Sequence, residues 1–256
     1  MDKILFDCIS FAKRAGLLLL KDFKKVKEYS KRGHSKAIKT IYDKASENLI
    51  KRLISKNYPE HSILSEETGY IEKDPKYLWV VDPLDGTGNF VNGNPLFSVS
   101  IAFLENNKLK YGAIYFPISN ETFFAERGKG AFLNGKRIFV SKIDKLEKSY
   151  FVTCEGVEKS KKRKAKLYSI IISKAVDIRK LGSGSLECAW VASGRAEAYL
   201  TFKVPPWDVA AGVLLVEEAG GKVTDFKGRE WSLRKCDFLA SNSLIHKKIL
   251  KLVKDI

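Results

Sequence analysis

The sequence predicts an α+β fold in which a largely antiparallel sheet is flanked by helices. Apolar positions at helical spacing over residues 3–27 and 40–56 indicate two long helices. Short apolar runs at residues 97–103 and 111–116, separated by a polar turn, indicate paired strands. The chain has 256 residues, of which 45% are hydrophobic, so it can form the core of one large domain or of two fused lobes.

The remaining elements follow in order along the chain. The polar, basic residues 29–36 are predicted to form a loop between the first two helices. Residues 62–65 form a short strand. The apolar run from Trp79 forms a buried strand that Pro83 should end, because proline lacks a backbone donor. We expect further strands at residues 122–125, 151–153, 178–181, 196–202 and 238–241, a hairpin at 128–138, and helices at 186–193, 207–219 and after 241.

The composition indicates a reducing compartment and anionic ligands. No apolar run is long enough to span a membrane. The four cysteines occur singly, so we expect free thiols and a cytoplasmic location. Lys and Arg number 46 against 30 Asp and Glu, which gives a net charge of +16. Such a surface attracts a small phosphorylated substrate and could also hold nucleic acid loosely.

Two carboxylates come together at the end of the central strand. Asp82 ends the apolar run, Pro83 turns the chain, and Asp85 follows within the same turn. Buried charges of the same sign repel each other, and a divalent cation removes this conflict. Hard oxygen ligands with waters left over suit Mg²⁺ or Mn²⁺. A plain acidic turn is the alternative, since Asp, Pro and Gly are ordinary turn residues.

A glycine-rich turn, Gly86-Thr87-Gly88, follows these acids and leads into a helical start. Free backbone N–H groups in such a turn suit a phosphate group. Metal ligands and an anion-binding turn therefore lie within a few residues of each other. Our hypothesis from these residues is metal-assisted attack on a phosphate ester.

Further segments carry acids that could reach the same point. Asp43 lies in the first turn of the predicted second helix, where the local sequence favours a helix-dipole role. Glu66 and Glu67 follow the strand at 62–65. Adjacent strand residues point to opposite faces, so at most one should reach a metal, and we expect it to be Glu66. Asp208 opens a helix, where it either caps the helix or supplies a third carboxylate.

The polar residues 141–148 suggest a boundary between two sub-lobes, 1–142 and 143–256, of a single domain. In the second sub-lobe, Lys159 to Lys166 is the densest run of charge. It could contact nucleic acid, a membrane surface or an acidic partner. A solvated helix start is favoured, because no aromatic residues interleave with the run.

Three motifs occur together in the chain in the following order: Glu66-Glu67, the run from Asp82 to Thr87, and Trp207-Asp208-Val209-Ala210-Ala211-Gly212 with Glu218-Ala219-Gly220-Gly221. In this combination the chain resembles the inositol monophosphatase family over nearly its whole length. That family belongs to the lithium-sensitive, Mg²⁺-dependent sugar phosphatase superfamily, which includes fructose-1,6-bisphosphatases and 3′-phosphonucleotide phosphatases. The resemblance implies a layered αβαβα sandwich, usually found as a homodimer.

The resemblance also implies a set of metal ligands and two to three Mg²⁺ ions. One ion would be held by Glu66, Asp82 and the carbonyl oxygen of Leu84. A second would be held by Asp82, Asp85 and Asp208. A third, weaker ion would depend on Glu66. Mn²⁺ is a possible substitute.

Catalytic and substrate roles follow from the same resemblance. Gly86 and Thr87 would hold the phosphate through their backbone N–H groups. Thr87 and Asp43, together with Glu66, would orient and activate the attacking water. The other implied substrate contacts are Asp85, Gly182, Ser183, Gly184, Thr201 and Asp208.

Two positions depart from the family pattern. Inositol-preferring members often have a Glu seven residues before the helix Asp, where it binds sugar hydroxyls, and here this residue is Thr201. Members also often carry an Asp six residues before the activating Asp, and here this residue is Ala37. Thr201 favours a broader enzyme that accepts inositol phosphates and fructose 1,6-bisphosphate.

The expected function is hydrolysis of inositol monophosphate, fructose 1,6-bisphosphate or both by a Mg²⁺-dependent phosphomonoesterase. Hydrolysis of 3′-phosphoadenosine 5′-phosphate is a second reading, although we find no adenine-stacking motif. An RNA-associated accessory role is a third, supported by the net charge of +16 and the basic run. The acid set argues against this third reading as the sole role, because a pure binding module needs no metal-directed groups.

Overall fold

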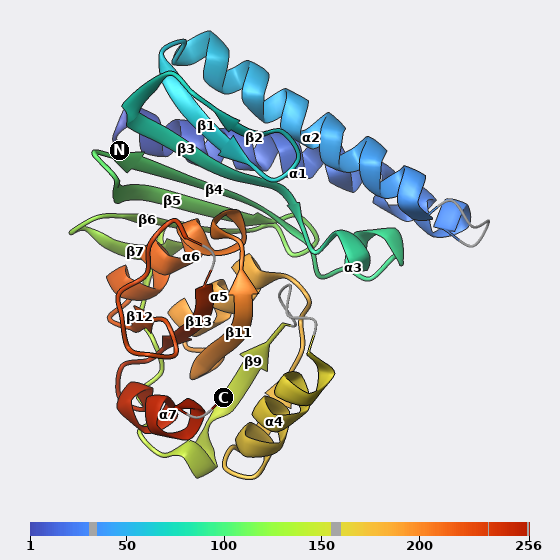
Figure 1. Ribbon diagram of the computed structural model, residues 1–256. Coiled ribbons are helices and arrows are strands. Elements are labelled where there is room, and N and C mark those ends of the chain that lie inside the picture. The colour runs from blue at the N-terminus through green and yellow to red at the C-terminus, as the bar shows by residue number, and fades with distance from the viewer. Residues whose placement is uncertain (31–34, 155–159, 235, 255) are drawn as a thin grey trace.

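The computed structural model describes residues 1–30, 35–154, 160–234, 236–254 and 256. Within these residues the chain forms two β-sheets and seven α-helices (Figure 1). The first sheet contains β1 (His61–Ser65), β2 (Gly69–Ile71), β3 (Asp74–Asp85), β4 (Ser98–Glu105), β5 (Lys108–Phe116), β6 (Glu121–Glu126), β7 (Gly130–Leu133) and β8 (Lys136–Ile138). Their spatial order is β2-β1-β3-β4-β5-β6-β7-β8, and all neighbours except β1 and β3 are antiparallel.

The second sheet has five strands in the order β10-β9-β11-β13-β12. These strands are β9 (Tyr150–Thr153), β10 (Asp177–Arg179), β11 (Ala198–Val204), β12 (Lys222–Thr224) and β13 (Cys236–Ser241). The helices are α1 (Lys3–Ser30), α2 (Ser35–Asn57), α3 (Thr87–Val91), α4 (Lys161–Ile172), α5 (Gly184–Ala192), α6 (Pro206–Glu218) and α7 (His246–Val253), with a short 3₁₀ turn at Leu146–Lys148.

The sheets and helices stack as five layers (Figure 1). Helices α1 and α2 cover one face of the first sheet, and α5 and α6 lie between the two sheets. Helices α4 and α7 cover the outer face of the second sheet. The predicted αβαβα sandwich is therefore confirmed.

Strands β3 and β4 are buried on both faces, which explains their nearly continuous apolar runs. On β3, Trp79 packs in the core beneath α1 and α2, whereas Val80 packs in the core beneath α6. On β4, Ile101 packs in the core beneath α1 and α2, whereas Ala102 packs in the core beneath α6. The end of β3 is therefore fixed from both sides, and this end carries the two aspartates of the central motif.

Small residues let α6 approach both its neighbours. A Cβ added to Gly112 on β5 would lie 3.0 Å from the carbonyl oxygen of Ala211 on α6. A Cβ added to Gly212 would lie 2.3 Å from the Cβ of Cys188 on α5. Ala211 and Gly212 thus let a strand approach α6 on one side and a helix approach it on the other.

We expect Gly212→Ala to lower the free energy of unfolding by about 1–3 kcal/mol, because the added methyl group overpacks the α5–α6 contact. Adding Cys188→Gly removes the clashing Cβ and should recover part of the loss. Urea unfolding measures both variants. Gly88→Ala is the control, since its Cβ would meet no atom within 4 Å. Equal losses in Gly212→Ala and Gly88→Ala would contradict the packing argument.

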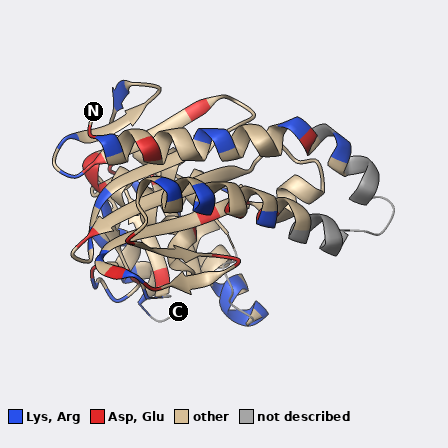
Figure 2. Ribbon diagram, turned by 90° about the horizontal axis from the view of Figure 1, so that it is seen from above, with Lys and Arg blue, Asp and Glu red and all other residues tan. Residues whose placement is uncertain are grey.

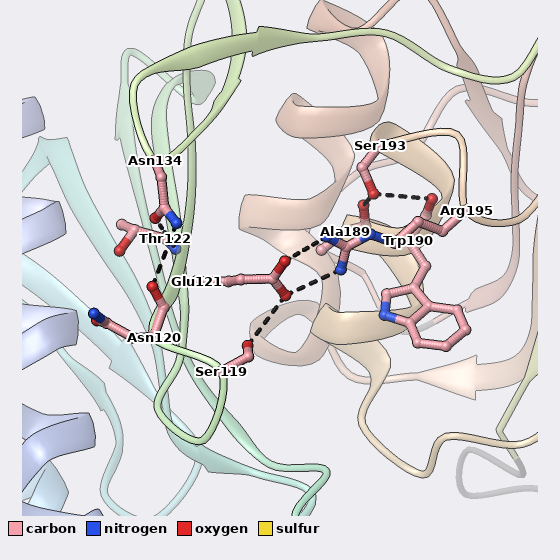
Figure 3. Close-up of polar contacts among 9 residues, drawn as sticks. All are labelled: Ser119, Asn120, Glu121, Thr122, Asn134, Ala189, Trp190, Ser193 and Arg195. Atoms are coloured by element: carbon pink, nitrogen blue, oxygen red, sulfur yellow. Dashed lines mark hydrogen bonds and ion pairs between the residues drawn. The ribbon is translucent and has the colours of Figure 1, made fainter.

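An ion pair joins the first sheet to the helix layer between the sheets (Figure 3). Arg195, which follows α5, donates from Nη1 to Glu121 Oε2 at 3.0 Å and from Nη2 to Oε1. Ser119 Oγ also donates to Glu121, at 3.1 Å. The hydrogen bond and charge of Arg195 lower the pKa of Glu121. This bidentate geometry fixes α5 relative to β6.

Three predictions about elements were wrong or incomplete. Pro83 does not end the strand: β3 continues to Asp85, and the pairing with β4 shifts between Asp82 and Asp85, so the missing N–H falls at an irregularity. The second helix begins at Ser35, five residues before the predicted start; of the predicted loop, residues 31–34 lie outside the described part of the chain. The short strands β2 and β12 were not predicted.

None of the helices in the described ranges is long and apolar enough to cross a membrane.

Candidate active site

The end of β3 collects carboxylates from separate parts of the chain. Asp82 is almost fully buried and accepts a hydrogen bond from the N–H of Leu84 at 3.1 Å. Burial, followed by the charges of Glu66, Asp85 and Asp208, raises the pKa of Asp82 well above its ordinary value. Glu66, Asp85 and Asp208 are thus close enough to Asp82 for their charges to act on it.

Asp85 also holds the start of α5 against β3. Its Oδ2 accepts from Ser183 Oγ at 2.6 Å and from the N–H and hydroxyl of Ser185, the N–H at 2.7 Å. Its Oδ1 accepts the N–H of Gly184 at 3.1 Å. Burial raises the pKa of Asp85 and these hydrogen bonds oppose the rise. Oδ1, with one such bond, is the oxygen with more capacity for a cation.

Asp43 reaches the site from α2. Its Oδ1 lies 3.0 Å from Thr87 Oγ1, which is also 3.0 Å from the carbonyl oxygen of Leu84. Because α2 begins at Ser35, Asp43 is in the third turn of the helix and not in the first. The helix-dipole role favoured by the local sequence is therefore wrong. Asp43 is fully buried beside the central motif.

Glu66 and Glu67 lie in a turn, because β1 ends at Ser65. One carboxylate oxygen of each lies within 4.8 Å of a carboxylate oxygen of Asp43 and of the other. The alternation of strand side chains does not apply in a turn, so both carboxylates lie near Asp43, and the expectation that Glu66 alone is a direct metal ligand stays a prediction. Glu66 is partly buried, whereas Glu67 is exposed.

Glu47, which the sequence analysis missed, holds this turn in place. It lies one helical turn after Asp43 on α2 and is 3% exposed. Its carboxylate accepts from Ser65 Oγ, from the N–H of Thr68 at 3.0 Å and from Thr68 Oγ1 at 2.5 Å. In the sequence, only its spacing from Asp43 indicates that Glu47 lies on the same face of the helix. This spacing does not identify Ser65 and Thr68 as its hydrogen-bond partners.

The glycine-rich turn and the 181–184 loop are tied together. Gly86 has φ 85°, and a Cβ there would lie 2.8 Å from the carbonyl oxygen of Leu96. Asn89 on α3 donates from Nδ2 to the carbonyls of Leu96 at 2.6 Å and Leu181 at 2.7 Å. Gly182 packs against the same amide. The predicted phosphate and substrate segments are therefore neighbours.

A second buried acid, Glu187, supports that loop and was also missed. Its Oε1 accepts the N–H groups of Leu181 at 3.0 Å and Gly182 at 3.3 Å. Burial raises its pKa to about 8. Thr201 is fully buried, 3.2 Å from the Sγ of Cys154, so its hydroxyl is already within hydrogen-bonding distance of a partner.

With this geometry in place, comparison with known proteins is informative. A model of the inositol monophosphatase family matches residues 1–256. The chain belongs to the inositol monophosphatase family. It is 39% identical to a fructose-1,6-bisphosphatase/inositol-1-monophosphatase of Thermotoga maritima, covering 100% of this chain and 97% of the relative. It is 38% identical to the Nus factor SuhB of Haemophilus influenzae, covering 99% and 97%.

The fold agrees with this inositol monophosphatase assignment. The crystal structure of an extragenic suppressor protein, SuhB, from Bartonella henselae superposes with a TM-score of 0.90 at 33% identity, covering 99% of this chain and 100% of that chain. The protein is thus an inositol monophosphatase-family phosphatase, and members of this family are generally Mg²⁺-dependent.

The residues present fit such ions. The charges that act most strongly on Asp82 are all negative, namely Glu66, Asp85 and Asp208. Asp43, Glu66 and Glu67 bring further carboxylate oxygens within 4.8 Å of one another. Carboxylate and carbonyl oxygens are the ligands that Mg²⁺ prefers.

Proposed function

We propose that this phosphatase is a Mg²⁺-dependent phosphomonoesterase that hydrolyses inositol monophosphates, fructose 1,6-bisphosphate or both. The observation that carries the proposal is the convergence of Glu66, Asp82, Asp85 and Asp208 beside the Thr87–Asp43 pair. The name of the Thermotoga maritima relative joins the same two activities.

We assign the metal ligands by position in the motifs. Glu66, Asp82 and the Leu84 carbonyl would hold one Mg²⁺, and Asp82, Asp85 and Asp208 a second. Glu66 would support a third. When bound, Mg²⁺ lowers the pKa of a coordinated water and offsets the charge of the leaving oxygen.

Thr87 and Asp43 supply the proton acceptor in this proposal. The Thr87 hydroxyl donates to Asp43 Oδ1 at 3.0 Å, which leaves an oxygen lone pair for an incoming water. As that water attacks phosphorus, its proton passes to Thr87 Oγ1 while the hydroxyl proton moves to Asp43. The backbone N–H groups of Gly86 and Thr87 bind the phosphate oxygens.

We expect Thr87→Ala to lower kcat by roughly 10²-fold or more, because the relay between water and Asp43 is lost. Thr87→Ser keeps the hydroxyl and is the matched control, with most of the activity retained. Steady-state kinetics with inositol 1-phosphate at saturating Mg²⁺ measures both. If alanine and serine variants lose activity equally, the hydroxyl has no role in the reaction.

On the substrate side, we propose that Gly182, Ser183 and Gly184 contact the sugar or polyol mainly through backbone groups. The Ser183 hydroxyl already donates to Asp85 at 2.6 Å and is buried. Thr201 is buried beside Cys154, so we propose that it shapes this wall indirectly. Asp208, in the first turn of α6, is partly exposed and is the more direct candidate for substrate hydroxyls.

A substrate panel with and without Mg²⁺ tests the function. Inositol 1-phosphate, fructose 1,6-bisphosphate and 3′-phosphoadenosine 5′-phosphate are compared by phosphate release. We expect kcat/KM to be highest for one of the first two and activity to vanish with EDTA. Preference for the nucleotide would instead favour the 3′-phosphonucleotide alternative. Mg²⁺-independent hydrolysis would remove the metal assignment.

An RNA-associated role is a second candidate, because several relatives carry the name Nus factor SuhB. Basic residues gather on the first turns of α4 (Figure 2). Arg163 is not freely available there, since it pairs with Asp237 at 2.6 Å and lies over the Phe202 ring. Salt-dependent RNA binding that survives loss of Asp82 would support this role.

We further propose that the protein is a cytoplasmic homodimer. None of the four cysteines, all of which the structure describes, forms a disulfide bond, which agrees with a reducing compartment. Light scattering on the purified protein measures the mass directly, and a monomer at micromolar concentration would contradict the dimer.

A further inference from the structure

A cavity of about 1000 Å³ lies at the opposite end of α6 from Asp208. Its walls come from the β4–β5 hairpin, the last turns of α6, β12 and the segment from Gly228 to Arg234. Asp208 and Glu217 lie on the same helix, roughly 14 Å apart along its axis. The cavity is therefore separate from the acidic site, and its role does not depend on the function proposed above.

The floor of this cavity is apolar. Leu104, Leu109, Val213 and Val223 line it and are at most 6% exposed. Trp231 forms part of the wall and packs partly against the central core. Its Nε1 donates no hydrogen bond to any residue that the structure describes. An indole beside an apolar floor suits a flat aromatic ligand.

The rim of the cavity is basic. Lys108, Lys222 and Arg234 line it and are exposed, and in the residues that the structure describes none of their side chains makes an ion pair. The neighbouring cations are different, since Lys110 pairs with Glu105 at 2.7 Å and Arg127 pairs with Glu217 at 2.7 Å.

Glu230 is the remaining acid of the lining. Lys108, Lys222 and Arg234 line the same cavity, so the rim keeps an excess of positive charge.

We propose that this cavity binds a nucleotide, with the base beside Trp231 and the phosphates at Lys108, Lys222 and Arg234. The volume is at the upper end of the range for small-molecule sites. The apolar floor and the aromatic wall match the base of such a ligand, and the unpaired cations match its phosphates. The acidic site offers no comparable environment, because it repels phosphates unless cations are bound.

Calorimetric titration with ADP in the presence of EDTA tests the proposal. We expect one ADP per chain, with adenosine and ribose 5-phosphate each binding at least tenfold more weakly. The double variant Lys222→Glu/Arg234→Glu should weaken ADP binding at least tenfold. Lys136→Glu/Lys174→Glu is the matched control, since it makes the same charge change at exposed positions outside the cavity.

Trp231 variants test the aromatic wall separately. Trp231→Phe keeps a flat ring and should retain binding, whereas Trp231→Leu should weaken it at least fivefold. Thermal melts check that both variants fold. If Trp231→Leu does not fold, the ADP titration of the charge variants decides whether the cavity binds ADP. Absence of ADP binding, equal binding of inorganic phosphate, or an equal loss in the control double variant would each overturn the proposal.

Discussion

We expect Asp82→Asn to reduce hydrolysis by roughly 10³-fold or more without lowering the melting temperature measured in EDTA. Asp82 is the carboxylate on which the charges of Glu66, Asp85 and Asp208 all act. Without bound cations, replacing it by a neutral side chain of the same shape removes repulsion from a buried cluster. The same change removes an oxygen ligand that both principal metal assignments share.

The response to Mg²⁺ separates this explanation from a simple loss of folding. A ligand present at a hundred times its Kd stabilises a protein by about 2.7 kcal/mol, so the wild type should melt later in Mg²⁺ than in EDTA. Asp82→Asn should show a much smaller shift. Scanning fluorimetry with and without Mg²⁺ measures both proteins. A variant that melts earlier than the wild type in EDTA would show that Asp82 stabilises the apo fold.

Asp85→Asn should also be inactive, but we expect it to lose at least about 3 kcal/mol of unfolding free energy. Asp85 accepts from Ser183, Gly184 and Ser185, which ties α5 to β3. Both its oxygens accept hydrogen bonds, so either orientation of an asparagine would direct its NH₂ group at a backbone N–H. Two aspartates three residues apart thus have opposite effects on the stability of the metal-free protein.

Urea unfolding in EDTA measures this difference. Ser183→Ala is a graded control, since it removes one hydrogen bond to Asp85 and leaves the carboxylate in place. It should cost about 1.5 kcal/mol and keep measurable activity. If Asp85→Asn proves as stable as Asp82→Asn in EDTA, the hydrogen bonds from the start of α5 do not support the fold.

The part of the site that the sequence predicts is the part encoded locally. Asp82, Asp85 and Gly86 are close in the chain, so their types and order were enough to suggest a metal beside an anion-binding turn. The local sequence predicts only a helix-dipole role for Asp43, because its true place depends on where α2 begins and on how α2 packs over β3. Only the resemblance to a family indicated its role.

The two missed acids, Glu47 and Glu187, have the same explanation. Each is buried, and each accepts hydrogen bonds from a turn whose shape follows from the packed fold. From the sequence alone, a glutamate in a helix is predicted to be exposed to solvent, because its hydrogen-bond partners are not known.

The fold class was predictable, because strands buried on both faces and long amphipathic helices leave strong patterns. The three-residue strands β2 and β12 leave no periodicity to detect.

The burial of β3 on both faces bears on how substrate choice can diverge in evolution. Asp82 and Asp85 lie on a strand that contributes side chains to two cores, so side chains of another size at these positions would disturb the packing on both faces. The neighbouring segments, Glu66 to Thr68 and Leu181 to Ser183, lie outside this strand, and each is anchored by one buried glutamate. A lineage can therefore acquire a new alcohol preference by rebuilding the loop that begins at Leu181, while Glu66 and the aspartates of the acidic site stay in place.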